Sequence, residues 1–444
     1  MGDGRTRGAY GWLARVVPAE YGGEPIQRVE MTQLLLTILV LNTITFAEPP
    51  ILDSAAQEHQ SLFARVKPLI LANGRGLPHS LAESNESWFW INSHKLNPLL
   101  DAYEYSHDTV FLDVFVSLMK SILAERYMHP TDPDTWSGWY HYKTRGHSYM
   151  VIHAGIVYYQ PALRFVEIIR SDPAGLGDPF SELAESWFRD IIKVSIPAWD
   201  KRGSWKEINA DEGWYIKLTQ KPDSDTHELI PEAGDLAGTT YAYNKLHEML
   251  KGFLIAYRLT GNDWYRDRIE KCARPFRRNW RVDDEHAEWN YREILGPWDY
   301  KRGKMGEGDT YFTSWIHPKG GYYGTDVEYV VACYNHGIGF GRADIEKLIQ
   351  TNTTFMFRGP SRREGSPQYT NIDGSFNVYK EANKKSFGHG SLWSSLAQFS
   401  PRIRELWKAQ IDRTDPERYG YANSVIGYLL AISKPISWTP KNVR

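Results

Sequence analysis

The stretch from Gly238 to Asp263 decides the fold class of this chain. It reads GTTYAYNKLHEMLKGFLIAYRLTGND, with Thr239 and Thr240 as candidate capping residues at its start. Apolar residues then recur every three or four positions, as they do on the buried face of an α-helix. The Thr-Gly-Asn triplet near the end is a typical helix stop. The sequence therefore predicts a long amphipathic helix over Thr240–Thr260.

The same periodicity is repeated along the chain on both sides of this stretch. Further helices are predicted over Leu62–Leu71, Ser87–Ser106, Thr109–Tyr127, Met150–Arg170, Ser181–Ser195, Asp263–Trp280, Asp326–His336, Arg342–Phe357, Ser391–Phe399, Ile403–Gln410 and Ala422–Ile432. Most are bounded by Gly, Pro, Asp or Asn. Only Gly203–Leu218 and Thr310–Tyr323 predict short β pieces or long loops.

About a dozen antiparallel helices of similar length indicate a mostly all-α fold. We expect an (α/α) toroid of six or seven helical hairpins, with short β pieces in loops, as one domain over residues 48–444. No low-complexity linker divides this region. An open α-solenoid is the alternative, but no fixed-period repeat supports it.

The N-terminus predicts export. From Met31 an apolar run is followed by Thr45-Phe46-Ala47, which resembles a signal-peptide cleavage site. We therefore expect residues 31–47 to be a signal peptide and residues 1–30 to be a non-native extension from an upstream start codon. The mature protein would be periplasmic or extracellular, without a membrane span, because the apolar run is short. The alternative is an N-terminal helix of a cytosolic protein.

Composition narrows the class of partner. The net charge of −2 argues against general nucleic-acid binding. Aromatic residues make up 14% of the chain, with 17 Trp and 27 Tyr, and such side chains often stack on sugar rings. Large helical cores also contain many aromatic residues. The two cysteines, Cys272 and Cys333, exclude a cysteine zinc site, and their pairing is left open.

Four side chains in two nearby segments are candidates for an acidic-sugar site. Asn244 and His247 are three residues apart on the predicted helix, and Arg292 and Tyr300 lie in the loop that follows the next helix. Amide, imidazole and guanidinium groups can neutralise a uronate carboxylate, which makes the neighbouring C5 proton removable. A tyrosine near a cation can remove that proton and protonate the departing O4.

At this point the chain resembles the helical-toroid polysaccharide lyases, specifically the alginate and glucuronan lyase family without C-terminal β-domains. Those enzymes combine Asn and His on one helix with Arg and Tyr on a loop some fifty residues on. Here Tyr300 follows Asn244 by 56 residues. In the best-known alginate lyases Asn and His are adjacent, whereas this chain has Asn-Lys-Leu-His. The resemblance implies β-elimination of a β-1,4-linked polyuronate, with Tyr300 as base and acid, Asn244 and His247 as neutralisers and Arg292 as orienting cation.

A second group of residues is predicted to contact an anionic polysaccharide. Arg145 and His147 lie in an aromatic, basic segment just before a predicted helix, and His153 lies six residues further on, in its first turn; the N-terminus of this helix would favour carboxylates. The further candidates for substrate contact are Trp289, Lys301 and His336. The histidine spacing does not fit a metal site, so we expect no metal ligands and no required cofactor, although a structural ion stays open.

Carboxylates support a rival function. An inverting glycoside hydrolase on the same toroid needs two carboxylates that face each other across a sugar. The candidates are Asp211 and Glu212, beside two tryptophans, and Glu232 and Asp235, beside Pro231. A non-catalytic sugar-binding protein is the third possibility. The sequence does not distinguish mannuronate, guluronate and glucuronate, nor endo from exo cleavage.

Overall fold

The structure is a computed structural model of the chain. It describes residues 54–75, 93–139, 155–223, 226–231, 236–317, 320–359, 369–375, 377–381, 384–388, 390–418 and 420–438. The predicted extension (1–30) and signal peptide (31–47) lie outside these ranges. None of the helices in the described ranges is long and apolar enough to cross a membrane.

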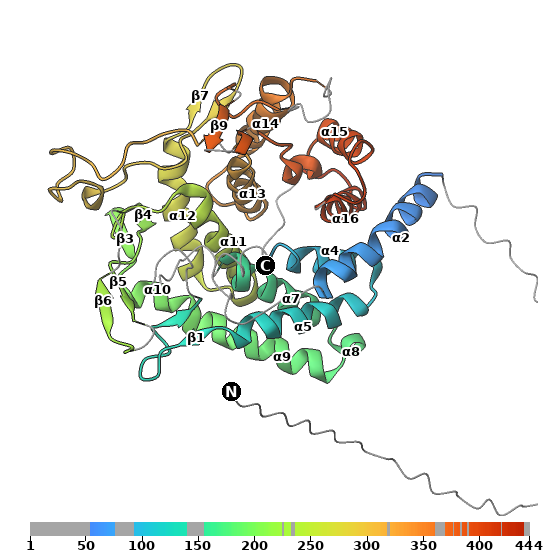
Figure 1. Cartoon of the computed structure of the whole chain (residues 1–444), viewed down its shortest axis with the longest axis horizontal. Helices are drawn as coiled ribbons and strands as arrows, with labels where there is room; N and C mark the ends of the chain where they lie inside the picture. The colour runs from blue at the N-terminus through green and yellow to red at the C-terminus, as the bar shows by residue number, and fades with distance from the viewer. Residues whose placement is uncertain are drawn as a thin grey trace, which may run out of the picture. The chain divides into compact units, whose positions relative to one another are not determined.

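Helices dominate the described residues (Figure 1). The α-helices are α2 (Ser54–Arg75), α4 (Leu96–Ser106), α5 (Val110–Ala124), α7 (Gln160–Ser171), α8 (Pro173–Leu176), α9 (Asp178–Asp190), α10 (Pro197–Lys201), α11 (Tyr243–Thr260), α12 (Asp263–Arg278), α13 (Tyr322–Asn335), α14 (Arg342–Gln350), α15 (Pro401–Ile411) and α16 (Tyr421–Ile432). Three segments are π-helical: η2 (Gly155–Tyr159), η3 (Ile191–Ser195) and η5 (Thr351–Met356). Two are short 3-10 helices: η4 (Pro297–Asp299) and η6 (Ser394–Gln398).

The helices form two concentric layers. In the inner layer α4 packs against α7, α7 against α11, α11 against α13, α13 against η6, and η6 against α16. Helix α16 then packs against α4, so the ring closes between the two ends of the described chain. The outer layer consists of α5, α9, α12, α14 and α15, each packed on an inner helix next to it in sequence (Figure 1). The predicted (α/α) toroid is confirmed, and the open solenoid is excluded by this closure.

Helix α11 forms where the sequence predicts it, but it starts at Tyr243 rather than at Thr240. The backbone N–H of Thr240 donates to Asp299, and the Thr240 carbonyl accepts from Arg292, so tertiary partners hold this residue outside the helix. At the other end Gly261 has φ of 64°, the left-handed conformation that ends a helix. Tight packing explains Gly252, because a Cβ there would lie 2.7 Å from Tyr159 of η2.

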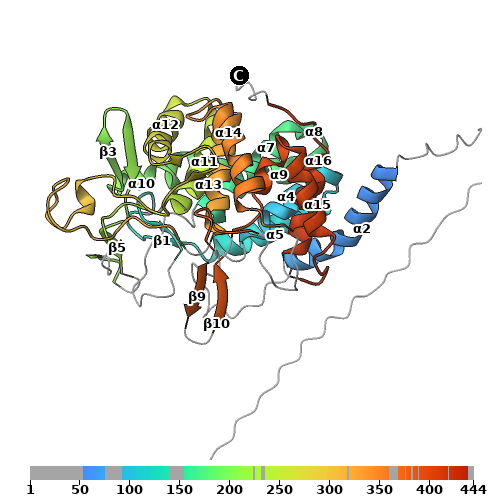
Figure 2. The same ribbon diagram turned by 90° about the horizontal axis from the view of Figure 1, so that it is seen from above.

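The β pieces are antiparallel two-stranded hairpins on the outside of the helices. They pair β1 (Tyr127–Met128) with β2 (Ser137–Gly138), β3 (Trp205–Asn209) with β4 (Glu212–Tyr215), β5 (Gln220–Pro222) with β6 (Leu229–Pro231), β7 (Arg281–Val282) with β8 (Ala287–Glu288), and β9 (Asn377–Glu381) with β10 (Lys384–Gly388). Figure 2 shows β9 and β10 projecting beyond the helices.

The two predicted β segments have different outcomes. Gly203–Leu218 contains β3 and β4, as expected. Thr310–Tyr323 is a loop that makes two isolated bridges, Tyr300 with Thr310 and Arg292 with Trp315, and α13 begins at its end. Helix α13 therefore starts four residues before the predicted Asp326. The missed turn contains two tyrosines and a glycine, which carry little helical signal of their own.

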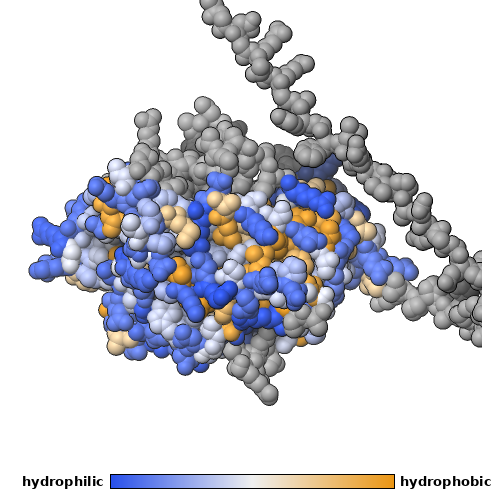
Figure 3. All heavy atoms as spheres, turned by 90° about the horizontal axis from the view of Figure 1, so that it is seen from below, coloured by the Kyte–Doolittle hydropathy of each residue, from blue (hydrophilic) through white to orange (hydrophobic). Residues whose placement is uncertain are grey.

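Exposed large apolar side chains are scattered over several elements. They include Met128 on β1, Leu229 on β6, Val282 on β7, and Met305, Tyr311 and Trp315 in the loop before α13. On the face drawn in Figure 3, hydrophobic surface gathers in spots that hydrophilic side chains interrupt. Most such residues need no special explanation.

Candidate active site

Helix α11 presents two chemically different faces to the rest of the ring. Tyr243 and His247 point outward, with their rings packed against Phe276 of α12. Asn244, Glu248 and Lys251 follow the helical spacing of three and four residues on another face. Glu248 contacts Gln160 of α7, and Lys251 contacts Glu328 of α13. Because α7 and α13 are the neighbouring inner helices, this face is directed toward the axis of the ring.

A polar network that is buried at Gln160 and Glu248 and exposed at Glu328 joins three inner helices. The Gln160 amide of α7 donates to the Glu248 carboxylate at 2.7 Å, and Lys251 Nζ lies 3.1 Å from Glu248 Oε2. Lys251 Nζ also donates to Glu328 of α13 at 2.6 Å. Burial lowers the pKa of Lys251, but Glu248 and Glu328 outweigh it, so the pKa lies above its ordinary value. Lys251 is therefore a fixed cation between two carboxylates.

A second network occupies the axis between α7 and α4. Arg164 of α7 donates to Asn97 at 3.0 Å, to Asp101 at 2.8 Å and to Glu104 at 2.9 Å. These three acceptors lie along one stripe of α4. Burial is the main cause that raises the pKa of Asp101 above its ordinary value, and Arg164 opposes this shift. Paired charges therefore line the inside of the ring where α4 and α7 meet.

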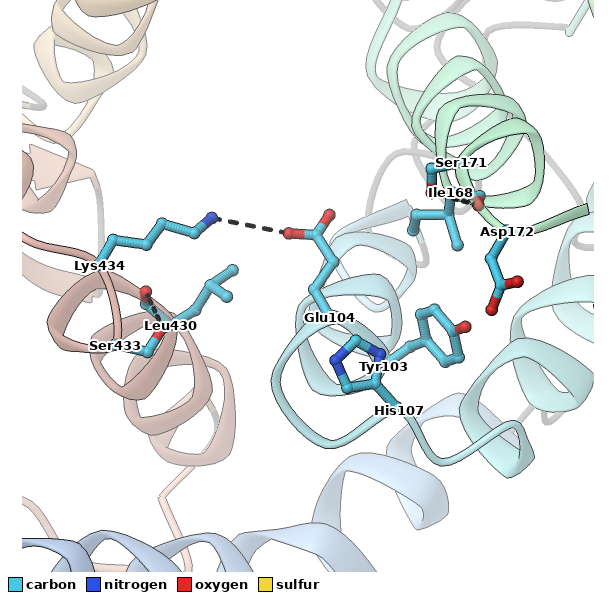
Figure 4. A pocket seen from close by; sticks show the side chains of 9 residues that line it. All are labelled: Tyr103, Glu104, His107, Ile168, Ser171, Asp172, Leu430, Ser433 and Lys434. Carbon is cyan, nitrogen blue, oxygen red and sulfur yellow. Dashed lines mark hydrogen bonds and ion pairs between the residues drawn. The ribbon is translucent and has the colours of Figure 1, made fainter. Parts of the chain in front are cut away.

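A cavity of about 280 Å³ lies at the C-terminal ends of α4, α7 and α16 (Figure 4). Glu104 projects into it and lies 3.9 Å from Lys434. Two serines in its lining turn back on their own helices: Ser171 donates to the Ile168 carbonyl and Ser433 to the Leu430 carbonyl. This cavity is at the opposite helix ends from Asn244, which lies in the first turn of α11.

The loop after β8 is fastened to the residues just before α11. Arg292 donates to the Thr240 carbonyl at 2.7 Å and to Thr239 Oγ1 at 3.1 Å. Asp299 is fully buried and accepts from the Thr240 backbone N–H at 2.9 Å and from Thr240 Oγ1 at 2.6 Å. The two segments singled out in the sequence therefore meet at the N-terminal end of α11. We call this region, with Asn244, Tyr291, Tyr300, Trp315 and Tyr322, the N-terminal site.

Arg292 is buried, with 5% of its surface exposed. Its hydrogen bonds among the described residues go to uncharged oxygens, and its guanidinium lies 4.1 Å from the centre of the Phe312 ring. Burial lowers the pKa of Arg292 to about 10. In this arrangement Arg292 holds the entry to α11 in place, and its contacts do not direct it toward a substrate.

His247 is a core residue. It is fully buried, with its Nδ1 2.6 Å from Asp326 Oδ1 and its ring stacked 4.2 Å from that of Tyr329. Burial lowers the pKa of His247, although Asp326 opposes the shift. Trp289, also fully buried, donates its indole N–H to the other oxygen of Asp326 at 2.9 Å. Neither side chain is exposed for direct contact with a polysaccharide.

The other predicted contacts are distributed differently. Asn244 is half-buried, and its Oδ1 has no hydrogen-bond partner among the described residues. Tyr300 is half-buried at the end of η4, next to Asp299. Lys301 is exposed, 3.8 Å from Asp309. His336 lies at the far end of α13, where its Nδ1 is 2.6 Å from the Ala332 carbonyl oxygen. The structure thus brings Asn244 and Tyr300 to one region and places His336 elsewhere.

Of the candidate carboxylates of the rival function, the two that the structure describes, Asp211 and Glu212, do not form a pair across a site. Asp211 is exposed and 3.1 Å from Arg274, and Glu212 accepts from Arg278. Both arginines belong to α12, so these carboxylates attach the β3–β4 hairpin to the outer layer. Glu232 and Asp235 lie outside the described residues, as do Arg145, His147 and His153.

Sequence reasoning missed the axial residues Glu248, Lys251 and Glu328. A signal was present: a helix with an otherwise buried surface carries Asn, Glu and Lys at spacings of four and three residues. It also missed Trp315, an exposed tryptophan whose carbonyl accepts from the N–H of Tyr291, the residue that is hydrogen-bonded to Tyr243 at the start of α11. In the described part of the chain, no group of three His, Cys, Asp or Glu side chains could hold a metal ion. Cys272 and Cys333 are both buried free thiols.

Comparison with known proteins identifies structures of related architecture but no family. No family model matches the sequence, and no curated protein is similar to it. An inactive variant of the α-1,6-mannanase GH76A of Salegentibacter sp. HEL1_6, in complex with α-1,6-mannotetrose, superposes with a TM-score of 0.40 and 13% identity. A complex with α-1,6-mannotriose gives 0.41 and 13%. Each superposition covers 84% of this chain and 96% of the mannanase. Similarity at this level assigns neither a substrate nor a reaction to the chain.

Proposed function

We propose that the chain is a carbohydrate-active enzyme and that its substrate binds at the N-terminal site. The observation that carries this proposal is the juxtaposition of Asn244, whose amide oxygen has no hydrogen-bond partner among the described residues, with the loop that bears Tyr300 and an exposed tryptophan. Polar groups beside exposed aromatic rings are the usual elements of a sugar site. The first turns of α11 and α13 add the positive ends of two helix dipoles.

The reaction that we propose first is β-elimination on a β-1,4-linked polyuronate, such as polymannuronate or glucuronan. Tyr300 removes the C5 proton, the C4–O4 bond breaks, and a C4=C5 double bond forms. The leaving O4 then takes a proton from the same phenol when both groups lie on one face of the sugar. The Asn244 amide and the helix N-termini stabilise the carboxylate as its charge develops.

This scheme changes the roles of two predicted residues. Because His247 is buried against Asp326, we propose that it positions α11 instead of touching the substrate. Because Arg292 holds Thr239 and Thr240, it positions the start of the same helix. Both residues would then influence the reaction through the placement of Asn244.

The decisive assay is digestion of purified polymannuronate and glucuronan, followed by ultraviolet absorbance of the new double bond. We expect Tyr300→Phe to abolish the signal while its thermal unfolding matches the wild type, because only a hydroxyl is removed. Undiminished turnover in this variant would remove Tyr300 from the mechanism. The assay is repeated with a chelator, and we expect the signal to be unchanged because the proposed chemistry uses no metal.

Glycoside hydrolysis is the second candidate, and the axial carboxylates favour it. Glu248 Oε2 and Glu328 Oε2 lie 3.1 and 2.6 Å from the same Lys251 nitrogen, so they are separated by less than the sum of these distances. Retaining glycosidases place their two carboxyl groups about 5 to 5.5 Å apart. The mannanases of similar architecture belong to this reaction class, but a likeness this loose adds no weight to it.

The two reactions give different products from any polysaccharide that the chain degrades. Hydrolysis releases reducing ends without the ultraviolet chromophore, and Glu248→Gln and Glu328→Gln would each abolish it. Elimination produces both reducing ends and the chromophore. We further propose that the protein is exported, which the pattern of residues 31–47 supports and which N-terminal sequencing of the secreted protein tests.

A further inference from the structure

The loop before α13 carries an indole that is both exposed and rigidly held. Trp315 is 42% exposed, whereas most tryptophans of the described chain are buried or half-buried. An exposed aromatic residue on its own needs no explanation. Trp315 differs from the other exposed apolar residues in the number of contacts that fix its position.

Backbone hydrogen bonds hold the segment on both sides of the indole. The Tyr291 N–H donates to the Trp315 carbonyl at 2.8 Å. Two residues later, the His317 N–H donates to the Tyr323 hydroxyl at 2.8 Å, and the Asn371 amide donates to the His317 carbonyl at 2.9 Å. The segment is thus attached to the loop after β8, to α13 and to the segment after η5.

Neighbouring rings support the edges of the indole. The ring centre of Trp315 lies 5.8 Å from that of Tyr291, in an edge-to-face arrangement, and 4.8 Å from that of His317. His317 in turn lies 4.7 Å from Tyr322, in the first turn of α13. These contacts cover part of the indole and leave about two-fifths of the residue open to solvent.

This aromatic cluster is continuous with the N-terminal site. The Tyr291 carbonyl accepts from the N–H of Tyr243, the first residue of α11, at 3.0 Å. Two backbone hydrogen bonds through Tyr291 therefore connect Trp315 to the residue next to Asn244. The backbone of Trp315 is therefore attached to the first turn of α11, in which Asn244 lies.

We propose that Trp315 is a stacking platform for a pyranose ring of the bound saccharide, at a position beside the unit that reacts. The electron-rich face of an indole attracts the C–H groups on the apolar face of a sugar, and such contacts need no charge on the ligand. Thr313, an exposed polar residue two positions before Trp315, lies beside the platform, which suits a hydroxyl-rich chain better than an apolar protein surface. The platform rests on the proposed function, because it takes the same saccharide.

The test is calorimetric titration with long oligosaccharides of β-1,4-linked mannuronate, β-1,4-linked glucuronate and α-1,6-linked mannose. We expect Trp315→Ala to weaken binding of the saccharide that the wild type binds by about five- to tenfold, whereas Trp315→Phe keeps most of the affinity. The control is Trp438→Ala. The Trp438 carbonyl accepts from Tyr334, so this indole belongs to the opposite end of α13, and its loss leaves binding unchanged.

The outcomes separate the platform from the proposed function. If the wild type binds and cleaves a saccharide and Trp315→Ala binds it equally well, the platform alone is overturned. If the wild type binds a saccharide without cleaving it and Trp315→Ala loses this binding, the platform is supported and the proposed enzyme activity is overturned. A wild type that neither binds nor cleaves any of the three overturns both. Matching thermal unfolding of the variants shows that lost binding is not lost folding.

Discussion

The outward and axial faces of α11 both carry polar side chains, but in very different surroundings. On the outward face, His247 lies in an aromatic core, where Asp326 accepts from it and from Trp289. On the other face, the amide oxygen of Asn244 has no partner among the described residues, and Lys251 forms ion pairs with Glu248 of the same helix and with Glu328 of α13. The difference teaches that the identity of a polar residue does not reveal whether it stabilises the helix packing or meets a ligand. Four predictions test this contrast, from the largest expected effect to the smallest.

The axial ion pairs give the largest expected change in stability. Lys251→Met leaves Glu248 as a buried carboxylate without its cation, and we expect a loss of about 3 to 5 kcal/mol in the free energy of unfolding. Denaturant titration measures it. Lys301→Met is the matched control, since Lys301 is exposed and its ion pair is loose, and we expect a change below about 0.5 kcal/mol. Equal losses of unfolding free energy in the two variants would show that the axial ion pairs stabilise the fold no more than an exposed ion pair does.

The carboxylate on the outward side is expected to rank next. Asp326→Ala deprives His247 and Trp289 of their common acceptor inside the core, and each unpaired buried donor costs about 1 to 3 kcal/mol. We expect the free energy of unfolding to fall by about 2 to 4 kcal/mol. Asp309→Ala, at an exposed position, is the control. A loss for Asp326→Ala no greater than for this control would contradict the core role of the carboxylate.

Acid pH should reveal the buried histidine. Burial lowers the folded-state pKa of His247, so the unfolded chain binds a proton first as the pH falls. The stability of the wild type therefore decreases from about pH 6.5 downward, until the pH passes the folded-state value. Each unit of pKa difference corresponds to about 1.4 kcal/mol. In unfolding curves at a series of pH values, we expect His247→Gln to lack this component. Parallel pH profiles for the two proteins would exclude it.

Asn244 should have the smallest effect on stability. Its amide oxygen has no partner to lose among the described residues, so Asn244→Ala should change the free energy of unfolding by less than about 1 kcal/mol. Turnover of the polysaccharide should nevertheless fall by at least about tenfold, because the Asn244 side-chain N–H group is the proposed donor to the carboxylate and removal of one such donor often costs more. Unaltered turnover in a stably folded variant would place substrate binding elsewhere.

Much of the fold follows from local signals. Apolar periodicity and the Thr-Gly-Asn stop predict α11 to within three residues at its start and correctly at its end. The β3–β4 hairpin also lies where the sequence places a β piece. The first turn of α13 is not predicted, because two tyrosines and a glycine have little helical propensity of their own and the turn is stabilised by the packing of the tyrosine rings.

The candidate site was predictable only in part. That Asn244 and His247 share one helix and that Arg292 and Tyr300 follow in one loop could be predicted, because chain order and helical periodicity are local properties. Tertiary contacts were needed to show that the loop is bound to Thr240, that His247 and Arg292 are enclosed, and that Glu248 and Lys251 pair with each other and with neighbouring helices. The physical reason is that burial and charge pairing depend on neighbours far apart in the chain. Residues 40° to 60° apart around one helix can therefore face a hydrophobic core or a polar axis.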